Sequence, residues 1–365
     1  MARPIPPALR FAVFLTAIAS CATSMDAADI PRPTGSKKIV SPDAKLELLF
    51  TRQIKAVGGL TEGAAVARDG SIYFSDITRG ETPGMIHRFD PITKKTSVFS
   101  NNSGKSNGLI FDDRGFLYAC EGAGYGGRRV ARWNVRTKEK TTVVDGIGGK
   151  RFNSPNDICI DSKGRLYFTD PRYVGHEPRE LKHRAVYRTN RKGDVVEVTH
   201  QVSKPNGVAL SPREDWLYVA DHDNGTDNID PDAPAPTPGD MKIYAFPLSK
   251  GLVAGERKTL YDFGSEKGCD GMTVDRQGNV YLTVRSPQRP GVLVLDPGGK
   301  EIAHIPTGPQ KQKTDAKNPP VGLPSNVEFG LGREGSVLYI TVDTSLYRIR
   351  LNAQGYHRQY AEPLE

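Results

Sequence analysis

The chain has 365 residues, of which 37% are hydrophobic and 25% are charged, and its formal net charge is +8 at pH 7. These values are close to those of ordinary globular proteins and exclude a chain that is disordered throughout. The 38 glycines and 27 prolines favour short strands joined by turns over long helices. The basic residues form no stripe with aromatic residues, which argues against nucleic-acid binding.

Residues 1–28 have the order of features expected of an export signal. Arg3 and Arg10 give a positive start, residues 11–19 form an apolar run too short to span a bilayer, and small residues follow. The residues up to Cys21 also resemble a bacterial lipoprotein cleavage site, in which case a lipid on Cys21 anchors the protein to a membrane. We therefore expect an exported protein, periplasmic or extracellular, with or without this anchor. Without it, the cleavage sites to consider follow Ala22, Ala27 and Ala28.

One pattern then recurs six times: an acidic or amide residue, a short alternating apolar run, a turn of the Asp-Gly type and a strand rich in aromatic residues. The first residues of successive copies are separated by 45, 49, 50, 64 and 56 positions. Such intervals are typical of propeller blades, each of about 40–50 residues. One four-stranded sheet cannot bury both faces, whereas six arranged radially do. The copies are residues 62–77, 107–122, 156–171, 206–222, 270–284 and 326–342.

The sequence therefore predicts an all-β fold, a six-bladed β-propeller with four-stranded antiparallel blades, over residues 45–353. The last copy has no clear fourth strand, whereas residues 45–50 (KLELLF) are strand-like. We expect this N-terminal strand to close the ring, because an open propeller leaves an exposed sheet edge; the alternative is an independent N-terminal arm. Residues 29–44 are interpreted as a linker and residues 354–365 as a C-terminal tail.

Two loops and three cysteines stand outside the repeat. Residues 223–240, rich in Pro and Asp, are interpreted as an insertion in the fourth blade that either covers the channel mouth or is an inert surface loop. A second loop, residues 308–320, is expected to be solvated. The three cysteines have no spacing typical of a disulfide framework or a zinc site, and buried thiols are expected at Cys120, Cys159 and Cys269.

Each copy begins with a side chain that offers an oxygen atom. Equivalent positions of six blades surround one axis, so these side chains are expected to converge at one mouth of the central channel. Asn-Gly and Asp-Gly are also ordinary turn signals, and turns are the alternative interpretation. Turn chemistry alone does not account for six oxygens at one register. The residues are Glu62, Asn107, Asn156, Asn206, Asp270 and Asn326.

Carboxylate and amide oxygens without His or Cys suit a hard cation such as Ca²⁺. A cation at this position would polarise an ester carbonyl, and a carboxylate beside it can act as general base. Asp270 is the preferred base, because Glu62 then remains to hold the metal. Asp157 and Asp221 are lesser candidates that either act as bases or brace the backbone, and His222 is either structural or an acid or base.

Two stretches resemble a known family. Ser106 to Glu121 (SNGLIFDDRGFLYACE) and Gly149 to Tyr173, with its NSPND segment, are similar to bacterial gluconolactonases. These belong to the superfamily of gluconolactonase, regucalcin and the luciferin-regenerating enzyme, whose members are six-bladed propellers. Relatives carry a His after the Cys-Glu pair, whereas this chain has Gly122, a departure that concerns the substrate and not the metal.

The resemblance implies one divalent cation in the channel, often calcium, with Zn²⁺, Mg²⁺ or Mn²⁺ as the alternatives. By motif, its ligands are Glu62, Asn156, Asn206 and Asp270, and Asp270 is also the presumed base. Five residues near the mouth are expected either to orient a polyhydroxylated substrate or to be structural. They are Asn107, Glu121, Arg151, Asn153 and Tyr173.

The function expected from the repeat and the resemblance together is metal-dependent hydrolysis of a small-molecule sugar lactone to its hydroxy acid. One alternative is hydrolysis of another ester or of a phosphotriester at the same metal. A second is a non-catalytic, calcium-containing propeller that binds sugar or protein. A third, an enzyme similar to strictosidine synthase, lacks such a metal ring. The sequence does not predict which lactone is used or the oligomeric state.

Overall fold

The computed structural model describes residues 30–53, 59–227, 237–315 and 317–361. Six antiparallel sheets account for nearly all regular structure in these residues, and the first three follow in chain order. Blade 1 is β3 (Leu60–Val66), β4 (Ile72–Ile77), β5 (Met85–Asp90) and β6 (Lys95–Ser100). Blade 2 is β7 (Ser106–Phe111), β8 (Phe116–Glu121), β9 (Arg129–Asn134) and β10 (Lys140–Val144). Blade 3 is β13 (Ile158–Ile160), β14 (Leu166–Asp170), β15 (Ala185–Thr189) and β16 (Val195–Thr199).

The remaining blades complete the series, with a short hairpin of β11 (Gly146–Ile147) and β12 (Lys150–Arg151) after blade 2. Blade 4 is β17 (Pro205–Leu210), β18 (Trp216–His222), β19 (Met241–Ser249) and β21 (Lys258–Asp262), with β20 (Leu252–Val253) beside β19. Blade 5 is β22 (Cys269–Val274), β23 (Val280–Val284), β24 (Gly291–Leu295) and β25 (Glu301–Pro306), extended by β1 (Thr34–Gly35). Blade 6 is β26 (Pro324–Phe329), β27 (Val337–Val342), β28 (Ser345–Arg350) and β2 (Glu47–Thr51).

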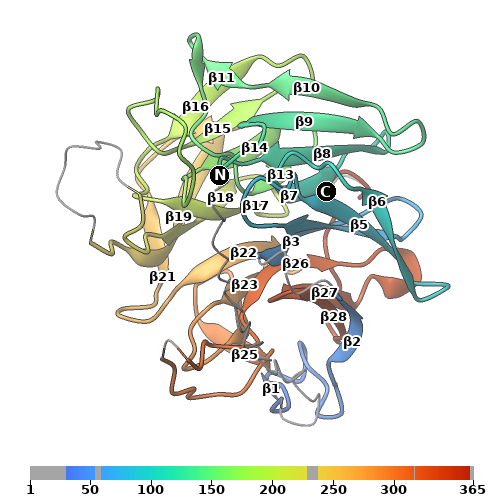
Figure 1. The fold of residues 1–365 in the computed structure, drawn as a ribbon. Coiled ribbons are helices and arrows are strands. Elements are labelled where there is room, and N and C mark those ends of the chain that lie inside the picture. Colours follow the sequence, from blue (N-terminus) through green and yellow to red (C-terminus); the bar gives the residue numbers. More distant parts are fainter. Residues whose placement is uncertain (1–29, 54–58, 228–236, 316, 362–365) are drawn as a thin grey trace, which may run out of the picture.

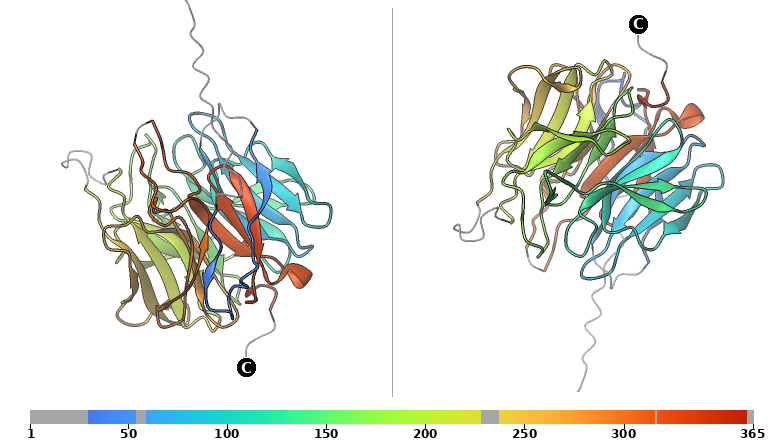
Figure 2. Two further views of the ribbon diagram at one scale, coloured as in Figure 1. Left: turned by 90° about the horizontal axis from the view of Figure 1, so that it is seen from below. Right: turned by 90° about the horizontal axis from the view of Figure 1, so that it is seen from above.

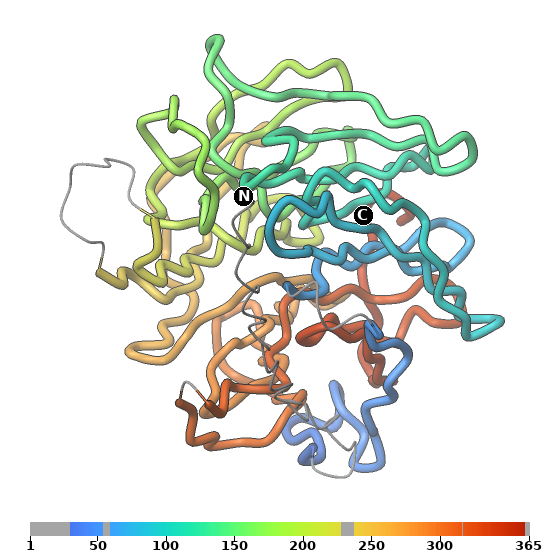
Figure 3. The backbone as a smooth tube through the Cα atoms, in the orientation of Figure 1, coloured from blue at the N-terminus to red at the C-terminus, as the bar shows by residue number. Residues whose placement is uncertain are grey.

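The blades form one ring. The first strand of each blade lies near the middle of the molecule in Figure 1, and each of these inner strands contacts the inner strand of the next blade, with β26 contacting β3. Figure 3 traces the chain once around this ring, from blue through green and orange to red. The predicted six-bladed β-propeller is therefore confirmed.

The N-terminal strand closes the ring, as expected. β2 pairs antiparallel with β28, with Glu47 opposite Arg348 and Thr51 opposite Ser345. Figure 2 shows the blue N-terminal strand beside the red C-terminal strands. The Arg348 guanidinium lies 2.8 Å from the Glu47 carboxylate and adds an ion pair to this pairing. Blade 6 therefore takes strands from both ends of the propeller, and β2 covers the edge that β28 would otherwise expose.

The hydrophobic core lies between the blades. Six clusters of buried residues are found in the described part of the chain, and each joins two adjacent blades. Between blades 1 and 2, for example, the Tyr73 ring packs edge-on against Phe111 with 5.1 Å between ring centroids. Each sheet buries both faces only because it has two neighbours, which is why the repeat does not fold as a single unit.

In three blades, the turn between the inner and the second strand is held by the same set of hydrogen bonds to an aspartate. The Oδ1 atoms of Asp112, Asp161 and Asp275 each accept two backbone N–H groups of their own turn, at 2.9–3.0 Å. In each case a tyrosine six residues later donates its hydroxyl to the other carboxylate oxygen. These tyrosines are buried in the core, so each hairpin turn is fixed to a blade interface.

Residues 30–44, which were expected to be a linker, are instead packed on blades 5 and 6. β1 pairs with the outer strand β25, with Thr34 opposite His304. Ile39 and Val40 are buried in the cluster that joins blade 5 to blade 6. This segment therefore extends the ordered domain toward the N-terminus, because its apolar residues cover the outer part of that interface.

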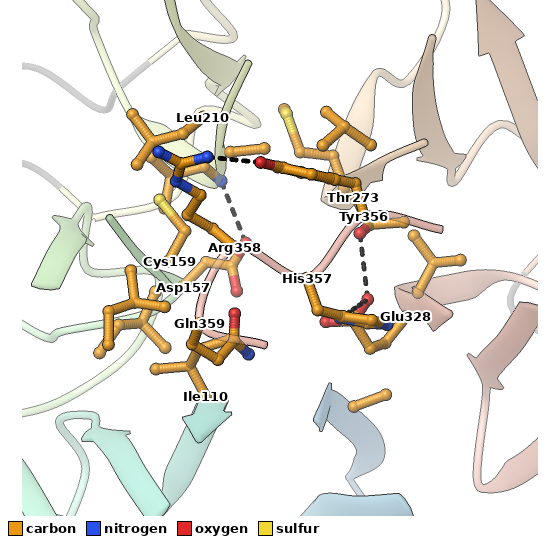
Figure 4. Close-up of a pocket in the computed structure, with 18 of the residues that line it drawn as sticks. Ile110, Asp157, Cys159, Leu210, Thr273, Glu328, Tyr356, His357, Arg358 and Gln359 are labelled. Atoms are coloured by element: carbon orange, nitrogen blue, oxygen red, sulfur yellow. Dashed lines mark hydrogen bonds and ion pairs between the residues drawn. The ribbon is translucent and has the colours of Figure 1, made fainter. Parts of the chain in front are cut away.

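The C-terminal residues, which were expected to be a tail, cross the base of the channel, the end opposite the residues that begin the six copies. His357 Nε2 lies 3.0 Å from the Gly330 carbonyl, Arg358 Nε lies 2.8 Å from Glu214, and the Tyr360 hydroxyl donates to the Val66 carbonyl at 3.2 Å. These contacts reach blades 6, 4 and 1. Figure 4 shows Tyr356, His357, Arg358 and Gln359 closing a cavity of about 70 Å³ at this end.

The two predicted loops leave the blades at different places. At the base of the insertion, the Asp223 N–H donates to the Asp240 carbonyl at 3.1 Å, which pairs the two ends of the loop. Residues 228–236 of it and the expected export signal at residues 1–28 lie outside the described residues. The second loop is largely exposed from residue 311 to residue 320 where it is described. None of the described helices is long and apolar enough to cross a membrane. The three described cysteines are free thiols.

Candidate functional site

Three of the six residues that begin the copies lie at β-bulges on the inner strands. In blades 2, 4 and 5 the pairing skips two residues of the inner strand, which are Asn107, Asn206 and Asp270, each with the glycine that follows. Glu62 is the last paired residue before the equivalent skip in blade 1, and Asn156 lies two residues before the start of β13. A bulge turns a side chain out of the regular alternation of a strand. Here it turns oxygen-bearing side chains toward the channel mouth.

The glycines after these residues are required by close packing and not by turns. A Cβ atom on Gly207 would lie 2.3 Å from the Asp270 carbonyl oxygen, and one on Gly271 would lie 2.4 Å from the Asn326 side chain. Each glycine therefore lets the next inner strand approach at the level of the ring. Although Asn-Gly and Asp-Gly are ordinary turn signals, the alternative interpretation as turns is wrong at these positions.

Five of the six oxygen-bearing residues line one cavity of about 310 Å³ at the channel mouth. They include all four predicted metal ligands, together with Asn107. Asn326 is the exception. In blade 6 the unpaired residue is Ser325, so Asn326 itself is paired, opposite Thr341. Its Oδ1 accepts the N–H of Val327 at 2.8 Å, and its Nδ2 donates to Asp157 at 3.3 Å. The five are Glu62, Asn107, Asn156, Asn206 and Asp270.

Asp157 lies beneath the cavity floor and braces the backbone, which is one of the two roles considered for it. Its Oδ2 accepts the N–H of Val208 at 3.0 Å and its Oδ1 accepts Asn326 Nδ2, so it joins blades 3, 4 and 6. It lines the lower cavity, which the C-terminal segment closes (Figure 4). Burial raises the pKa of this carboxyl to about 7, even though its hydrogen bonds favour the ionised form.

The electrostatics of the ring favour a cation. Burial, followed by repulsion from Asp270 and then from Asp157, raises the pKa of Glu62 well above its usual value. Arg285 is the nearby counter-charge, with Nη1 at 3.3 Å from Asp270 Oδ2. Within the described residues, no three His, Cys, Asp or Glu side chains form a metal site by themselves. The donors that fit a hard divalent ion are therefore two carboxylates completed by amide oxygens of Asn156 and Asn206.

Three carboxylates position the segments that enter the inner strands. Asp170 accepts the N–H groups of Asn153 and Ser154 at 2.8 and 2.5 Å, just before Asn156. Asp221 accepts those of Ser203 and Lys204, each at 2.9 Å, just before Asn206. Asp343 does the same for Gly322 and Leu323, at 2.6 and 3.2 Å, in blade 6. Asp221 therefore has the bracing role that was its alternative to acting as a base.

Sequence reasoning missed two cations in the cavity lining, Lys105 and Arg285. Lys105 Nζ donates to the carbonyls of Thr78 and Gly80, both at 2.7 Å, and burial lowers its pKa. A signal for it exists in the sequence, since Lys105 stands two residues before Asn107 as Lys204 stands two residues before Asn206. No equivalent signal precedes Arg285.

His222 also lines the cavity and has a defined tautomer. Its Nδ1 lies 2.9 Å from the Cys269 carbonyl oxygen, which can only accept, so Nδ1 carries the hydrogen and Nε2 is the acceptor of the neutral ring. Burial lowers the pKa of this imidazole. Tyr173, one of the predicted substrate residues, donates its hydroxyl to the His222 carbonyl at 3.1 Å and lines the cavity beside it.

Three other predicted substrate residues do not line this cavity. Glu121 is fully buried between two cations, with Arg129 Nε at 2.7 Å and Lys140 Nζ at 3.0 Å. Arg151 is exposed and contacts Asp145 and the Gly127 carbonyl. Asn153 is buried and donates to the His183 carbonyl at 2.9 Å. The structure therefore gives these residues structural partners, and only Asn107 and Tyr173 of the five reach the cavity.

A family model described as the SMP-30/Gluconolactonase/LRE-like region matches residues 60–344. Among curated proteins, the chain is similar to the gluconolactonase of Zymomonas mobilis, with 30% identity over 68% of this chain and 64% of the relative. Among solved structures, it is similar to a gluconolactonase from Xanthomonas campestris, with 25% identity, a TM-score of 0.69, and coverage of 88% of this chain and 95% of that one. A structure from Agrobacterium tumefaciens described as regucalcin, a calcium-binding protein, has 17% identity, a TM-score of 0.62, and coverage of 87% and 96%.

The alignment with the Zymomonas protein thus spans just under two thirds of that relative's length. The solved structure from Agrobacterium supports the fold alone at its level of identity. The match to the family model extends from the first inner strand, β3, into the turn between β27 and β28. It includes every residue of the oxygen-bearing set.

Proposed function

Because the chain belongs to the SMP-30/Gluconolactonase/LRE-like family, we propose that it hydrolyses a sugar lactone to the open hydroxy acid. The observation that carries this proposal is the cavity at the channel mouth, where carboxylate and amide oxygens from five blades converge. The named activity of the Zymomonas and Xanthomonas relatives supports it, since both are described as gluconolactonases.

We further propose that the reaction depends on a divalent cation, with Ca²⁺ as the first choice. Glu62, Asn156, Asn206 and Asp270 would hold it, because their oxygens are the donors of the cavity that suit a hard cation. The calcium-binding description of the Agrobacterium protein supports this choice. When bound, the cation would polarise the lactone carbonyl and stabilise the negative charge that develops on its oxygen.

In this proposal Asp270 is the general base. Its carboxylate takes a proton from a water molecule in the cavity, and Arg285 at 3.3 Å holds it in place. The water oxygen bonds to the carbonyl carbon, and the bond from this carbon to the ring oxygen then breaks. The ring oxygen receives the proton from Asp270. One lactone and one water therefore give one hydroxy acid, with Asp270 returned to its starting state.

The test is acid release from glucono-1,5-lactone, measured above the spontaneous rate with added Ca²⁺ and with chelator. We expect calcium-dependent hydrolysis by the wild type and a loss of about 100-fold or more in kcat for Asp270→Asn, because a general base contributes about 10²–10⁴-fold. Asp262→Asn is the matched control, since that carboxylate is half exposed on an outer strand.

No acceleration of lactone hydrolysis under any condition would exclude the lactonase and favour another ester as substrate, or a binding propeller. Equal rates for the chelated and calcium-loaded proteins would exclude the role of the metal. Equal rates for Asp270→Asn and Asp262→Asn would exclude Asp270 as base.

We also propose that the protein is exported. The motivation is the charged start, apolar run and small residues within residues 1–28. Mass spectrometry of the mature protein tests this, because a lipid on Cys21 and cleavage after Ala22, Ala27 or Ala28 give different N-terminal masses. An uncleaved N-terminus would overturn the proposal.

A further inference from the structure

The cavity at the channel mouth has two unlike parts. Its floor is the set of oxygen-bearing residues described above, whereas much of its outer wall is apolar. Ala123 and Val174 come from the loops after β8 and β14, Pro155 precedes β13, and Leu60 and Ile77 come from blade 1. Gly122 adds no side chain to this wall. A substrate whose reacting carbonyl lies at the floor therefore has its outer part against carbon atoms.

The polar groups on the same wall already have partners in the protein. Ser154 Oγ accepts the Ala123 N–H at 2.9 Å, and the Tyr173 hydroxyl donates to the His222 carbonyl. Lys105 Nζ is held by two backbone carbonyls at 2.7 Å. These bonds use part of the hydrogen-bonding capacity of the wall, which leaves less of it for the hydroxyl groups of a substrate.

The rim of the wall is both exposed and fixed. Val174 is 67% exposed, and Tyr125, which lies outside the cavity lining, is 54% exposed, so both present apolar area to the solvent. Glu177 accepts the N–H groups of Gly124 and Tyr125 at 2.9 and 3.0 Å, and so joins the loop after β14 to the loop after β8. The His176 ring packs on Tyr125 with 4.5 Å between centroids. The two loops that carry the apolar rim are therefore held together by hydrogen bonds and by ring packing.

We propose that the sugar lactone hydrolysed here carries an apolar substituent, alkyl or aryl, which packs on the wall formed by Ala123, Pro155 and Val174. This inference rests on the proposed lactonase function and narrows its substrate class. When an apolar substituent packs on this wall, the free energy gained is proportional to the apolar area that substituent and wall remove from water. A polyol chain without such a substituent removes little apolar area. Val174 is the specificity-determining residue in this proposal.

The test compares three lactones under the same conditions: glucono-1,5-lactone, unsubstituted δ-valerolactone, and δ-decalactone, which is a δ-lactone with a five-carbon chain. We expect kcat/KM for δ-decalactone to exceed that for δ-valerolactone by about tenfold or more, since each buried methylene contributes favourably. Val174→Asn is expected to lower kcat/KM for δ-decalactone by about fivefold and to leave that for δ-valerolactone unchanged. Val196→Asn is the matched control, because Val196 is a partly exposed valine on the outer strand β16.

The outcomes separate this inference from the function on which it rests. Hydrolysis of glucono-1,5-lactone with no preference for δ-decalactone over δ-valerolactone overturns the inference and leaves the lactonase in place. An equal loss on all three lactones in Val174→Asn overturns the role of Val174 in specificity. Hydrolysis of none of the three excludes the lactonase and this inference together.

Discussion

At the scale of single residues, the site depends on carboxylates that do not line its cavity. Asp170 is fully buried and fixes the backbone of Asn153 and Ser154, which leads into Asn156. Asp221 does the same for the segment that leads into Asn206. Substitution of such a residue is expected to displace an oxygen of the cavity without removing it, so its effect differs from that of a ligand substitution.

The pH dependence of stability gives a prediction for Asp170. Burial raises its pKa from 3.8 to about 6 in the folded protein. Because the folded state holds the Asp170 proton more tightly than the unfolded state, protonation of this carboxyl stabilises the fold. This stabilisation is fully present below about pH 4 and is lost as the pH rises through about 6. We expect the melting temperature of the wild type minus that of Asp170→Asn to fall between pH 4.5 and pH 7.5. The corresponding change in unfolding free energy between these two pH values is about 2 kcal/mol, at about 1.4 kcal/mol per unit of pKa. The same difference at both values would contradict the assignment.

At the scale of the element, the bulged inner strand is what turns a repeat into a site. Three of the ring residues occupy bulges, and the glycine behind each lets the neighbouring inner strand approach. Asn326, which is in register and followed by Val327, turns its side chain to its own backbone and to Asp157 instead. The local geometry of the strand therefore decides which oxygens reach the cavity.

Gly207→Ala tests this geometry. The added methyl would lie 2.3 Å from the Asp270 carbonyl oxygen, so one of the two inner strands must move. We expect a loss of about 1–3 kcal/mol of stability and weaker cation binding, because Asn206 and Asp270 flank the displaced backbone. Thermal unfolding and calcium titration measure the two effects. Gly298→Ala in an outer turn is the control, and an equal result for both variants would contradict the packing argument.

The sequence predicts the ring residues better than their surroundings. Oxygen side chains at one register of six copies are visible as a pattern, and four of them form the predicted ligand set. The bulge cannot be recognised in the sequence, because the dipeptides Asn-Gly and Asp-Gly occur both in turns and in bulges. Which of its two expected roles Glu121 has could not be predicted for a related reason, since its position beside Cys120 does not reveal that Arg129 and Lys140 enclose it.

At the scale of the whole molecule, the repeat period was sufficient to predict the number of blades and their closure by residues 45–50. The packing of the two segments outside the repeat was not predicted. Residues 30–44 and 354–361 have no period of their own, and their burial depends on surfaces that exist only once the ring is closed. The residue pattern of a segment cannot reveal the surface on which it packs when that surface is formed by other parts of the chain.

The C-terminal segment is expected to seal the base of the channel. Arg358→Ala removes the ion pair to Glu214 at 2.8 Å and the hydrogen bond to the Tyr356 hydroxyl at 2.6 Å. We expect a fall of about 5 °C or less in melting temperature. We also expect faster reaction of a thiol reagent with Cys159, which lines the lower cavity.

Arg350→Ala, on an exposed ion pair, is the control for this experiment, and the buried thiols of Cys120 and Cys269 are the internal reference. Unchanged labelling of Cys159 in Arg358→Ala would show that this arginine does not hold the seal.

The pairing of β2 with β28 has a consequence for biosynthesis. Thr51 leaves the ribosome 294 residues before Ser345, its partner across the sheet. At about 5–20 residues per second, the N-terminal strand waits roughly 15–60 seconds for that partner. During this time its apolar residues and unpaired backbone groups are available for contacts with other chains. The ring can therefore close only when synthesis of the chain is nearly complete.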